Sequence, residues 1–124
     1  MHFFWVYYHR GAKFDELRWS IRSVEANYAG PGRPRITVVG DRPPWFQGHH
    51  IKVPRVGGPA SFKSFRDSLN KLIVAMGSKE IDDEACWMMD DVYCLNKVTA
   101  DDLRVARHQG IICEKKANRL KGNK

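Results

Sequence analysis

Two adjacent carboxylates, Asp90 and Asp91, directly follow the apolar run Ala85-Cys86-Trp87-Met88-Met89. Neighbouring carboxylates repel each other unless solvent, a cation or a basic partner compensates their charge. Magnesium and manganese prefer oxygen ligands and often bridge carboxylates to substrate phosphates. The pair therefore predicts a metal site in which Asp91 acts as the catalytic carboxylate and the ion offsets charge on a departing diphosphate. The alternative is a solvated turn in which one aspartate caps the next element.

Three further polar residues follow predicted strands. His9 and Arg10 come after the aromatic run 3–8, and Asp41 comes after the β-branched run 35–39. Arg10 is able to bond two phosphate oxygens at once, and Asp41 is able to accept hydrogen bonds from a base or a ribose hydroxyl. We predict that His9, Arg10 and Asp41 hold a nucleotide. For Asp41 the alternative is a turn residue, and for His9 and Arg10 it is exposure to solvent.

Arg22 and Lys71 lie on predicted helices and would support the diphosphate if their side chains reached inward. Most charged residues on an amphipathic helix face water, so a solvent-exposed position is the alternative for both. The neighbours His49 and His50 point to opposite faces of a strand and cannot readily share one metal ion. We interpret these two histidines as structural.

Strands and helices must position these groups. Residues 14–28 show apolar positions three and four apart, as an amphipathic helix requires. A second helix is predicted from Phe62 to Met76, capped by Ser61, with its apolar side chains on one face, and a third from Ala100 to Ala106 is capped by Thr99. The predicted strands are 3–8, 35–39, 50–54, 85–89 and 110–113.

The alternation of these elements predicts an α/β fold with an open, mostly parallel sheet and helices on both faces. The 50–54 strand is partly polar, which favours a position near an edge. The 85–89 strand is apolar without alternation, which suits a central strand covered on both faces. Ligands bind such sheets at the carboxyl ends of the strands, where the polar residues above would meet. One α/β domain is expected over residues 1–113, followed by a basic, frayed tail over 114–124.

Composition limits the classes of partner. The 124 residues have a net charge of +7, so the surface should attract phosphates. Three cysteines, Cys86, Cys94 and Cys113, cannot all pair within one chain and match no zinc pattern, which favours a reducing, cytoplasmic setting. The apolar N-terminal run is too short to span a membrane. A small basic protein that binds nucleic acid or a phosphorylated partner without catalysis is the alternative function.

Several segments resemble a known family. Residues 14–25, Ile36–Asp41 and Pro44–Phe46 are similar to the second conserved region of the Stealth-type sugar-phosphate transferases. Met88–Tyr93 resembles that family's Asn-Asp-Asp-Val-Phe segment, with Met89 in place of the asparagine. More broadly, the layout is similar to the Rossmann-like nucleotide-binding half of the GT-A glycosyltransferases.

The resemblance implies a transferase that binds a nucleotide-sugar donor through manganese or magnesium at Asp90 and Asp91. It also implies transfer of the sugar, or of its phosphate, to a saccharide or other acceptor. The acceptor-binding half of the family has no counterpart in this sequence. The alternatives are a minimal enzyme, a fragment, or a remnant that binds without turnover, and a partner chain or a homo-oligomer is one possible source of the missing half.

Overall fold

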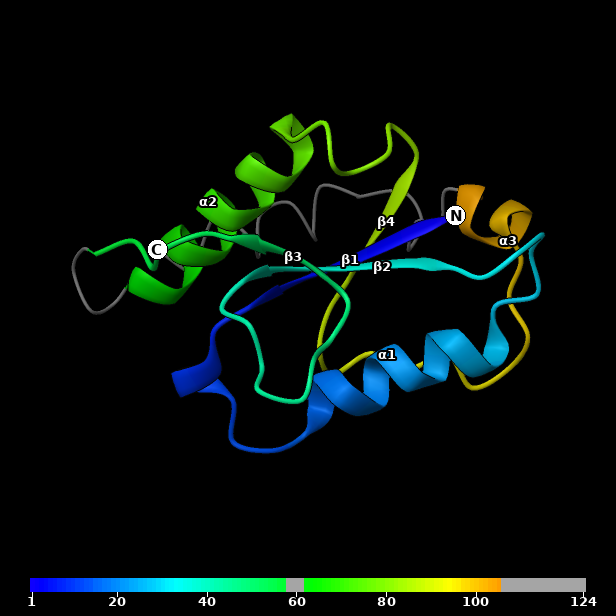
Figure 1. Cartoon of the computed structure of the whole chain (residues 1–124), viewed down its shortest axis with the longest axis horizontal. Coiled ribbons are helices and arrows are strands. Elements are labelled where there is room, and N and C mark those ends of the chain that lie inside the picture. Colours follow the sequence, from blue (N-terminus) through cyan, green and yellow to red (C-terminus); the bar gives the residue numbers. More distant parts are fainter. Residues whose placement is uncertain (58–61, 106–124) are drawn as a thin grey trace, which may run out of the picture.

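The chain folds into four parallel strands with helices on both faces of the sheet (Figure 1). The structure is a computed structural model that describes residues 1–57 and 62–105. The strand order is β3-β2-β1-β4, which confirms the predicted open parallel sheet. In chain order the elements are β1 (His2–Tyr7), the 3-10 helix η1 (His9–Gly11), α1 (Glu16–Asn27), β2 (Arg35–Gly40), β3 (His49–Lys52), α2 (Lys63–Gly77), β4 (Ala85–Met88) and α3 (Ala100–Arg104).

The central strand β1 divides the core into two apolar clusters, because successive side chains of a strand point to opposite faces. Phe3, Trp5 and Tyr7 pack with the buried α1 residues Leu17, Ile21 and Val24. Phe4 faces the other side, in a smaller cluster that includes Val39, Val53 and Ala75 of α2. The predicted apolar stripe of α1 is thus confirmed over its helical part.

Most of the predicted apolar stripe of α2 faces solvent, although Leu72 is partly buried and packs against the Phe4 cluster. Phe62, at the N-cap, and Phe65, Ile73 and Met76 are each more than 60% exposed, whereas the buried residues of α2 are Asp67, Lys71 and Ala75. The small side chain of Ala75 allows α2 to pack close to the sheet. The opposite charges of Asp67 and Lys71, buried on the same side of the helix, compensate each other. Apolar periodicity located this helix correctly, but it did not indicate which side would be buried.

Among residues 1–57 and 62–105, strand β4 lies at an edge of the sheet and is partly exposed, which contradicts the prediction of a central strand covered on both faces. In the described part of the chain it pairs with β1 alone, and Trp87 is 46% exposed. The apolar run arose because Cys86 and Met88 pack towards α1 while Ala85 packs towards α2. Strand β3 occupies the opposite edge, as predicted. The strand predicted over 110–113 and the tail over 114–124 lie outside the described residues.

Thr99 caps α3 through a capping box, as the sequence predicts. Its Oγ1 accepts from the Asp102 amide at 3.3 Å, and the Asp102 carboxylate accepts from the Thr99 amide at 2.8 Å. The described helix ends at Arg104, earlier than the predicted Ala106. None of the helices described here has both the length and the apolar character needed to cross a bilayer.

A buried histidine anchors the amino end of the sheet. The Asp82 amide donates to His2 Nδ1 at 3.1 Å, so the ring proton sits on Nε2, which donates to Thr37 Oγ1 at 2.7 Å. The Thr37 hydroxyl then donates to His49 Nδ1 at 2.9 Å. The ring of His2 is fully buried, and burial, followed by the nearby Arg35 charge, lowers the pKa of His2 below its ordinary value of 6.5.

This burial predicts that acid destabilises the fold. Below pH 6.5 the unfolded chain protonates His2 before the folded chain does, so the stabilisation present above that pH is lost as pH falls through the lowered folded pKa. Urea unfolding between pH 8 and 5 should show this loss, and His2→Gln should make the profile flatter. The same change at exposed His9 should leave the slope intact. An unaltered slope in His2→Gln would contradict the prediction.

Candidate functional site

The carboxyl ends of all four strands meet at one edge of the sheet, because all four run in the same direction. There the His9 amide donates to Asp41 Oδ2 at 2.9 Å, joining the residues that follow β1 and β2. The Tyr7 hydroxyl lies 3.1 Å from His9 Nδ1. Burial, with the charges of Asp41 and Asp90 nearby, raises the pKa of Tyr7. The phenol therefore stays protonated at neutral pH.

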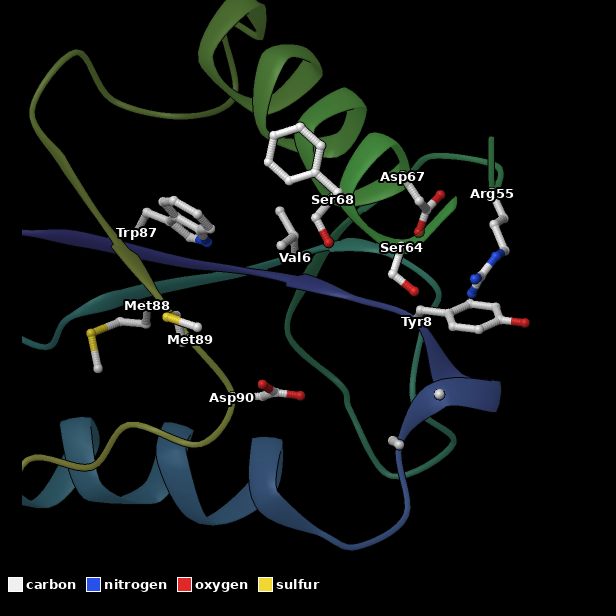
Figure 2. Close-up of a pocket in the computed structure, with 13 residues that line it drawn as sticks. Val6, Tyr8, Arg55, Ser64, Asp67, Ser68, Trp87, Met88, Met89 and Asp90 are labelled. Atoms are coloured by element: carbon white, nitrogen blue, oxygen red, sulfur yellow. The ribbon is translucent and has the colours of Figure 1, made fainter. Parts of the chain in front are cut away.

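A cavity of about 490 Å³ opens at this edge between β1, β4 and the first two turns of α2 (Figure 2). One part of its lining is apolar and comes mainly from the strands and the chain after β4. The other part is polar and comes mainly from Tyr8, Arg55, α2 and Asp90. The lining residues are Val6, Tyr8, Gly11, Ala12, Arg55, Ser64, Phe65, Asp67, Ser68, Trp87, Met88, Met89 and Asp90.

Arg55 is the principal cationic group of this lining. The carbon at the centre of its guanidinium lies 3.5 Å from the centre of the Tyr8 ring, a close cation–π contact. Its Nε is buried and has no hydrogen-bond partner among the described residues. A buried donor without a partner costs free energy, so a bound anion would compensate it. In Figure 2 the Arg55 side chain lies over the Tyr8 ring beside the start of α2.

The first turns of α2 supply a second feature that suits an anion. Ser64 and Ser68 line the cavity, and the N-cap residue Phe62 makes no side-chain cap hydrogen bond. The first backbone amides of a helix have no partner within it, and the helix dipole places partial positive charge there. The hydroxyls of Ser64 and Ser68 add donors on the same side. This end of α2 is therefore suited to a phosphate.

A buried ion pair fixes the Arg55 segment against α2. Lys71 Nζ donates to Asp67 Oδ2 at 2.5 Å, and both side chains are nearly inaccessible to solvent. The other oxygen, Asp67 Oδ1, accepts from the Val56 amide at 2.9 Å. Gly40 makes room for Lys71: its φ is +113°, and a Cβ there would lie 2.4 Å from the Tyr7 carbonyl oxygen and 2.7 Å from Lys71 Cε. Lys71 thereby positions the backbone next to Arg55.

The predicted site residues are only partly brought together. Asp90 lines the cavity, and exposed Asp91 follows it. His9, Arg10 and Asp41 lie at the same edge but outside the lining.

Lys71 and Arg22, the two site residues predicted on helices, do not join the other predicted residues at this cavity. Lys71 is 2% exposed and paired with Asp67 beneath the cavity, so it supports the site from below instead of reaching a diphosphate. Arg22 lines a different cavity, of about 310 Å³, between α1 and the segment that links β2 to β3. There its guanidinium lies 5.6 Å from the Trp19 ring centre.

The carboxylates near the cavity lined by Arg55 would suit a metal ion that binds together with a phosphate ligand. In the described ranges, no three His, Cys, Asp or Glu side chains converge as a metal-binding group. Both oxygens of Asp67 are already engaged, so Asp90 is the lining carboxylate that stays available, and exposed Asp91 is its neighbour in the chain. Magnesium commonly binds through one or two carboxylates plus substrate phosphates and water. Asp90 and Asp91 would thus hold a metal that a diphosphate also coordinates.

Sequence reasoning missed Tyr8 and Arg55. Arg55 directly follows the predicted strand 50–54, so the same rule would have found it. Tyr8 was placed inside the predicted strand 3–8, whereas β1 ends at Tyr7. Ser64 and Ser68 carry no comparable signal, because their role depends on how α2 is placed. Comparison of the chain with protein-family models, with curated proteins and with solved structures finds no match to any of them.

Proposed function

We propose that the chain binds a nucleotide-sugar in the cavity at the carboxyl edge of the sheet and transfers the sugar or its phosphate. The observation that carries this proposal is that Arg55, with its unpaired Nε, and Asp90 line the same cavity beside the start of α2. A diphosphate would bond the Arg55 guanidinium and the first amides of α2. A divalent cation held by Asp90 and Asp91 would offset the charge that develops on the leaving diphosphate.

The apolar part of the cavity suits the less polar end of such a ligand. Val6, Trp87 and Met88 line it on the side of β1 and β4. Aromatic and aliphatic side chains commonly pack against the flat faces of nucleoside bases. The polar part, with Arg55 and Asp90, would then hold the diphosphate and its metal. This division matches the base and the diphosphate of a nucleotide-sugar, with the sugar attached beyond the diphosphate.

Calorimetric titration with uridine and guanosine diphosphate sugars, with and without manganese, tests the proposal. We expect manganese-dependent binding that weakens about tenfold or more in Asp90→Asn, because a charged ligand of the metal is lost. Asp83→Asn is the matched control, since Asp83 lies before β4 at the opposite edge. The absence of manganese-dependent heat for every donor would contradict the proposal. Steep salt-dependent binding to nucleic acid in its place would favour the non-catalytic alternative.

A further inference from the structure

A second cavity, of about 310 Å³, lies on the α1 side of the sheet, between α1 and the segment that links β2 to β3 (Figure 1). None of the residues that line it also line the cavity beside Arg55. Its volume is at the lower end of the range for ligand pockets, about 300–1,000 Å³, which suits a ligand of one or two rings. We call this cavity the α1 groove.

The partly exposed Trp45 forms an aromatic wall of the α1 groove, and a hydrogen-bonded turn holds it in place. The Phe46 amide donates to the Pro43 carbonyl oxygen at 3.0 Å, and Arg42 Nε donates to the Phe46 carbonyl oxygen, also at 3.0 Å. The buried Phe46 ring meets the Trp45 ring edge-on at 6.0 Å. Gly48 leaves room for that ring, because a Cβ there would lie 2.5 Å from Phe46 Cζ. The indole is therefore positioned before a ligand binds.

Three polar side chains border the α1 groove and are available to a ligand. Arg22 and Glu25 come from α1, and Gln47 comes from the opposite wall. In the described part of the chain, the side chains of Glu25 and Gln47 form no hydrogen bond or ion pair, and Arg22 contacts only the Trp19 ring, at 5.6 Å. That distance is near the outer limit of a cation–π contact, about 6 Å, so the guanidinium keeps its donors free.

This set of side chains suits hydroxyl groups better than phosphates. Arg22 has only donors, the Glu25 carboxylate has only acceptors, and the Gln47 amide has both. A sugar hydroxyl both donates and accepts, so hydroxyls would satisfy all three side chains. A phosphate has only acceptors at neutral pH, and the Glu25 carboxylate would repel its charge. The same repulsion opposes the backbone of a nucleic acid.

The aromatic wall suits the remainder of a sugar. One face of a sugar ring presents C–H groups with a slight positive charge, and the face of an indole ring carries partial negative charge. A sugar ring that packs against Trp45 would therefore be held by its apolar face, while its hydroxyls would point towards the polar side chains.

We infer that the α1 groove binds a neutral saccharide, with one sugar ring against Trp45 and its hydroxyls bonded to Arg22, Glu25 and Gln47. The saccharide site stands on its own contacts. It rests on the proposed function only for the role of the saccharide, which would be the acceptor of the transfer. Acceptor binding would then lie on the α1 side of the sheet and donor binding in the cavity lined by Arg55.

NMR titration of the full chain with maltotriose, cellotriose and triacetylchitotriose tests the inference. These titrations contain no nucleotide-sugar and no metal, so their outcome is independent of donor binding. The indole N–H signals of the four tryptophans report on the contacts separately. We expect at least one of the saccharides to shift the Trp45 signal saturably in the millimolar range, because a small ligand with few contacts binds weakly. The Trp19 signal should stay in place.

Trp45→Ala and Glu25→Ala should each weaken this binding about fivefold or more, because one removes the aromatic wall and the other removes a hydrogen-bond acceptor. The amide signals of Gln47 and Gly48 follow binding in both variants. Trp19→Ala is the matched control, because Trp19 is exposed and lies 5.6 Å from an arginine, as Trp45 does, but is outside the α1 groove. Equal weakening in Trp19→Ala would overturn the inference.

Inorganic phosphate, titrated at the same concentrations, distinguishes a saccharide site from an anion site. We expect it to leave the Trp45 signal in place. A phosphate-induced shift that is larger than any saccharide effect, and that grows in Glu25→Ala, would overturn the inference in favour of an anion site. The absence of a saturable Trp45 shift with all three saccharides would also overturn it.

Discussion

Arg55→Ala should weaken binding of the manganese nucleotide-sugar complex by roughly 10- to 100-fold, because a hydrogen bond to a charged group contributes about 1.5–3 kcal/mol. Arg55 is the strongest cationic donor in the lining, and its buried Nε has no partner in the described chain. A ligand anion that reaches this donor would satisfy it. Calorimetric titration of the folded variant with the donor that binds best measures the effect.

Two further variants distinguish specific recognition by the Arg55 guanidinium from a general effect of positive charge. Arg55→Lys keeps the positive charge but loses the planar guanidinium that lies over Tyr8, so most of the loss in affinity should remain. Arg18→Ala is the matched control, because Arg18 also lies over an aromatic ring, that of Trp45, but lines the cavity on the α1 side. Equal weakening in Arg18→Ala would indicate a general charge effect and would contradict a specific role for Arg55.

The strand-end rule explains why so much of the fold and the location of the candidate site could be predicted from the sequence. Aromatic and β-branched runs gave β1 and β2, and the intervening helical pattern made their connection a crossover. Parallel strands then place whatever follows each of them at one edge. This reasoning correctly brought the backbone of His9 to the carboxylate of Asp41, which lie 32 positions apart in sequence.

The direction in which a helix faces could not be predicted in the same way. Periodicity shows that Phe65 and Ile73 share a face of α2, but it does not indicate what that face meets. Lys71 was predicted to support a diphosphate, with a solvent-facing position as the alternative. The structure shows neither, because its partner Asp67 lies one turn away and makes burial of both tolerable. Burial of this pair depends on Gly40 and the Val56 amide, which are distant in sequence. The local pattern of apolar and polar residues in α2 does not contain information about these distant contacts.

Lys71→Met should lower the free energy of unfolding by about 3–5 kcal/mol, because it leaves the Asp67 carboxylate buried without its cation. Methionine has a similar length and fills the same space, so loss of packing contributes little. Urea unfolding measures the change. Arg104→Met is the control, since it removes a cation paired with Glu84 and Asp101 at the surface and should cost far less. A similarly small cost for Lys71→Met would show that solvent reaches the Asp67 carboxylate.

The double variant Lys71→Met with Asp67→Leu separates stability from positioning. Replacing both members of a buried ion pair by apolar residues is often close to neutral, so most of the lost stability should return. The Val56 amide would still lack its acceptor, because Asp67 Oδ1 accepts from it at 2.9 Å in the wild-type protein. Nucleotide-sugar binding should therefore stay weak in a variant that is again stable. Recovery of stability together with affinity would mean that Asp67 does not position the Arg55 segment.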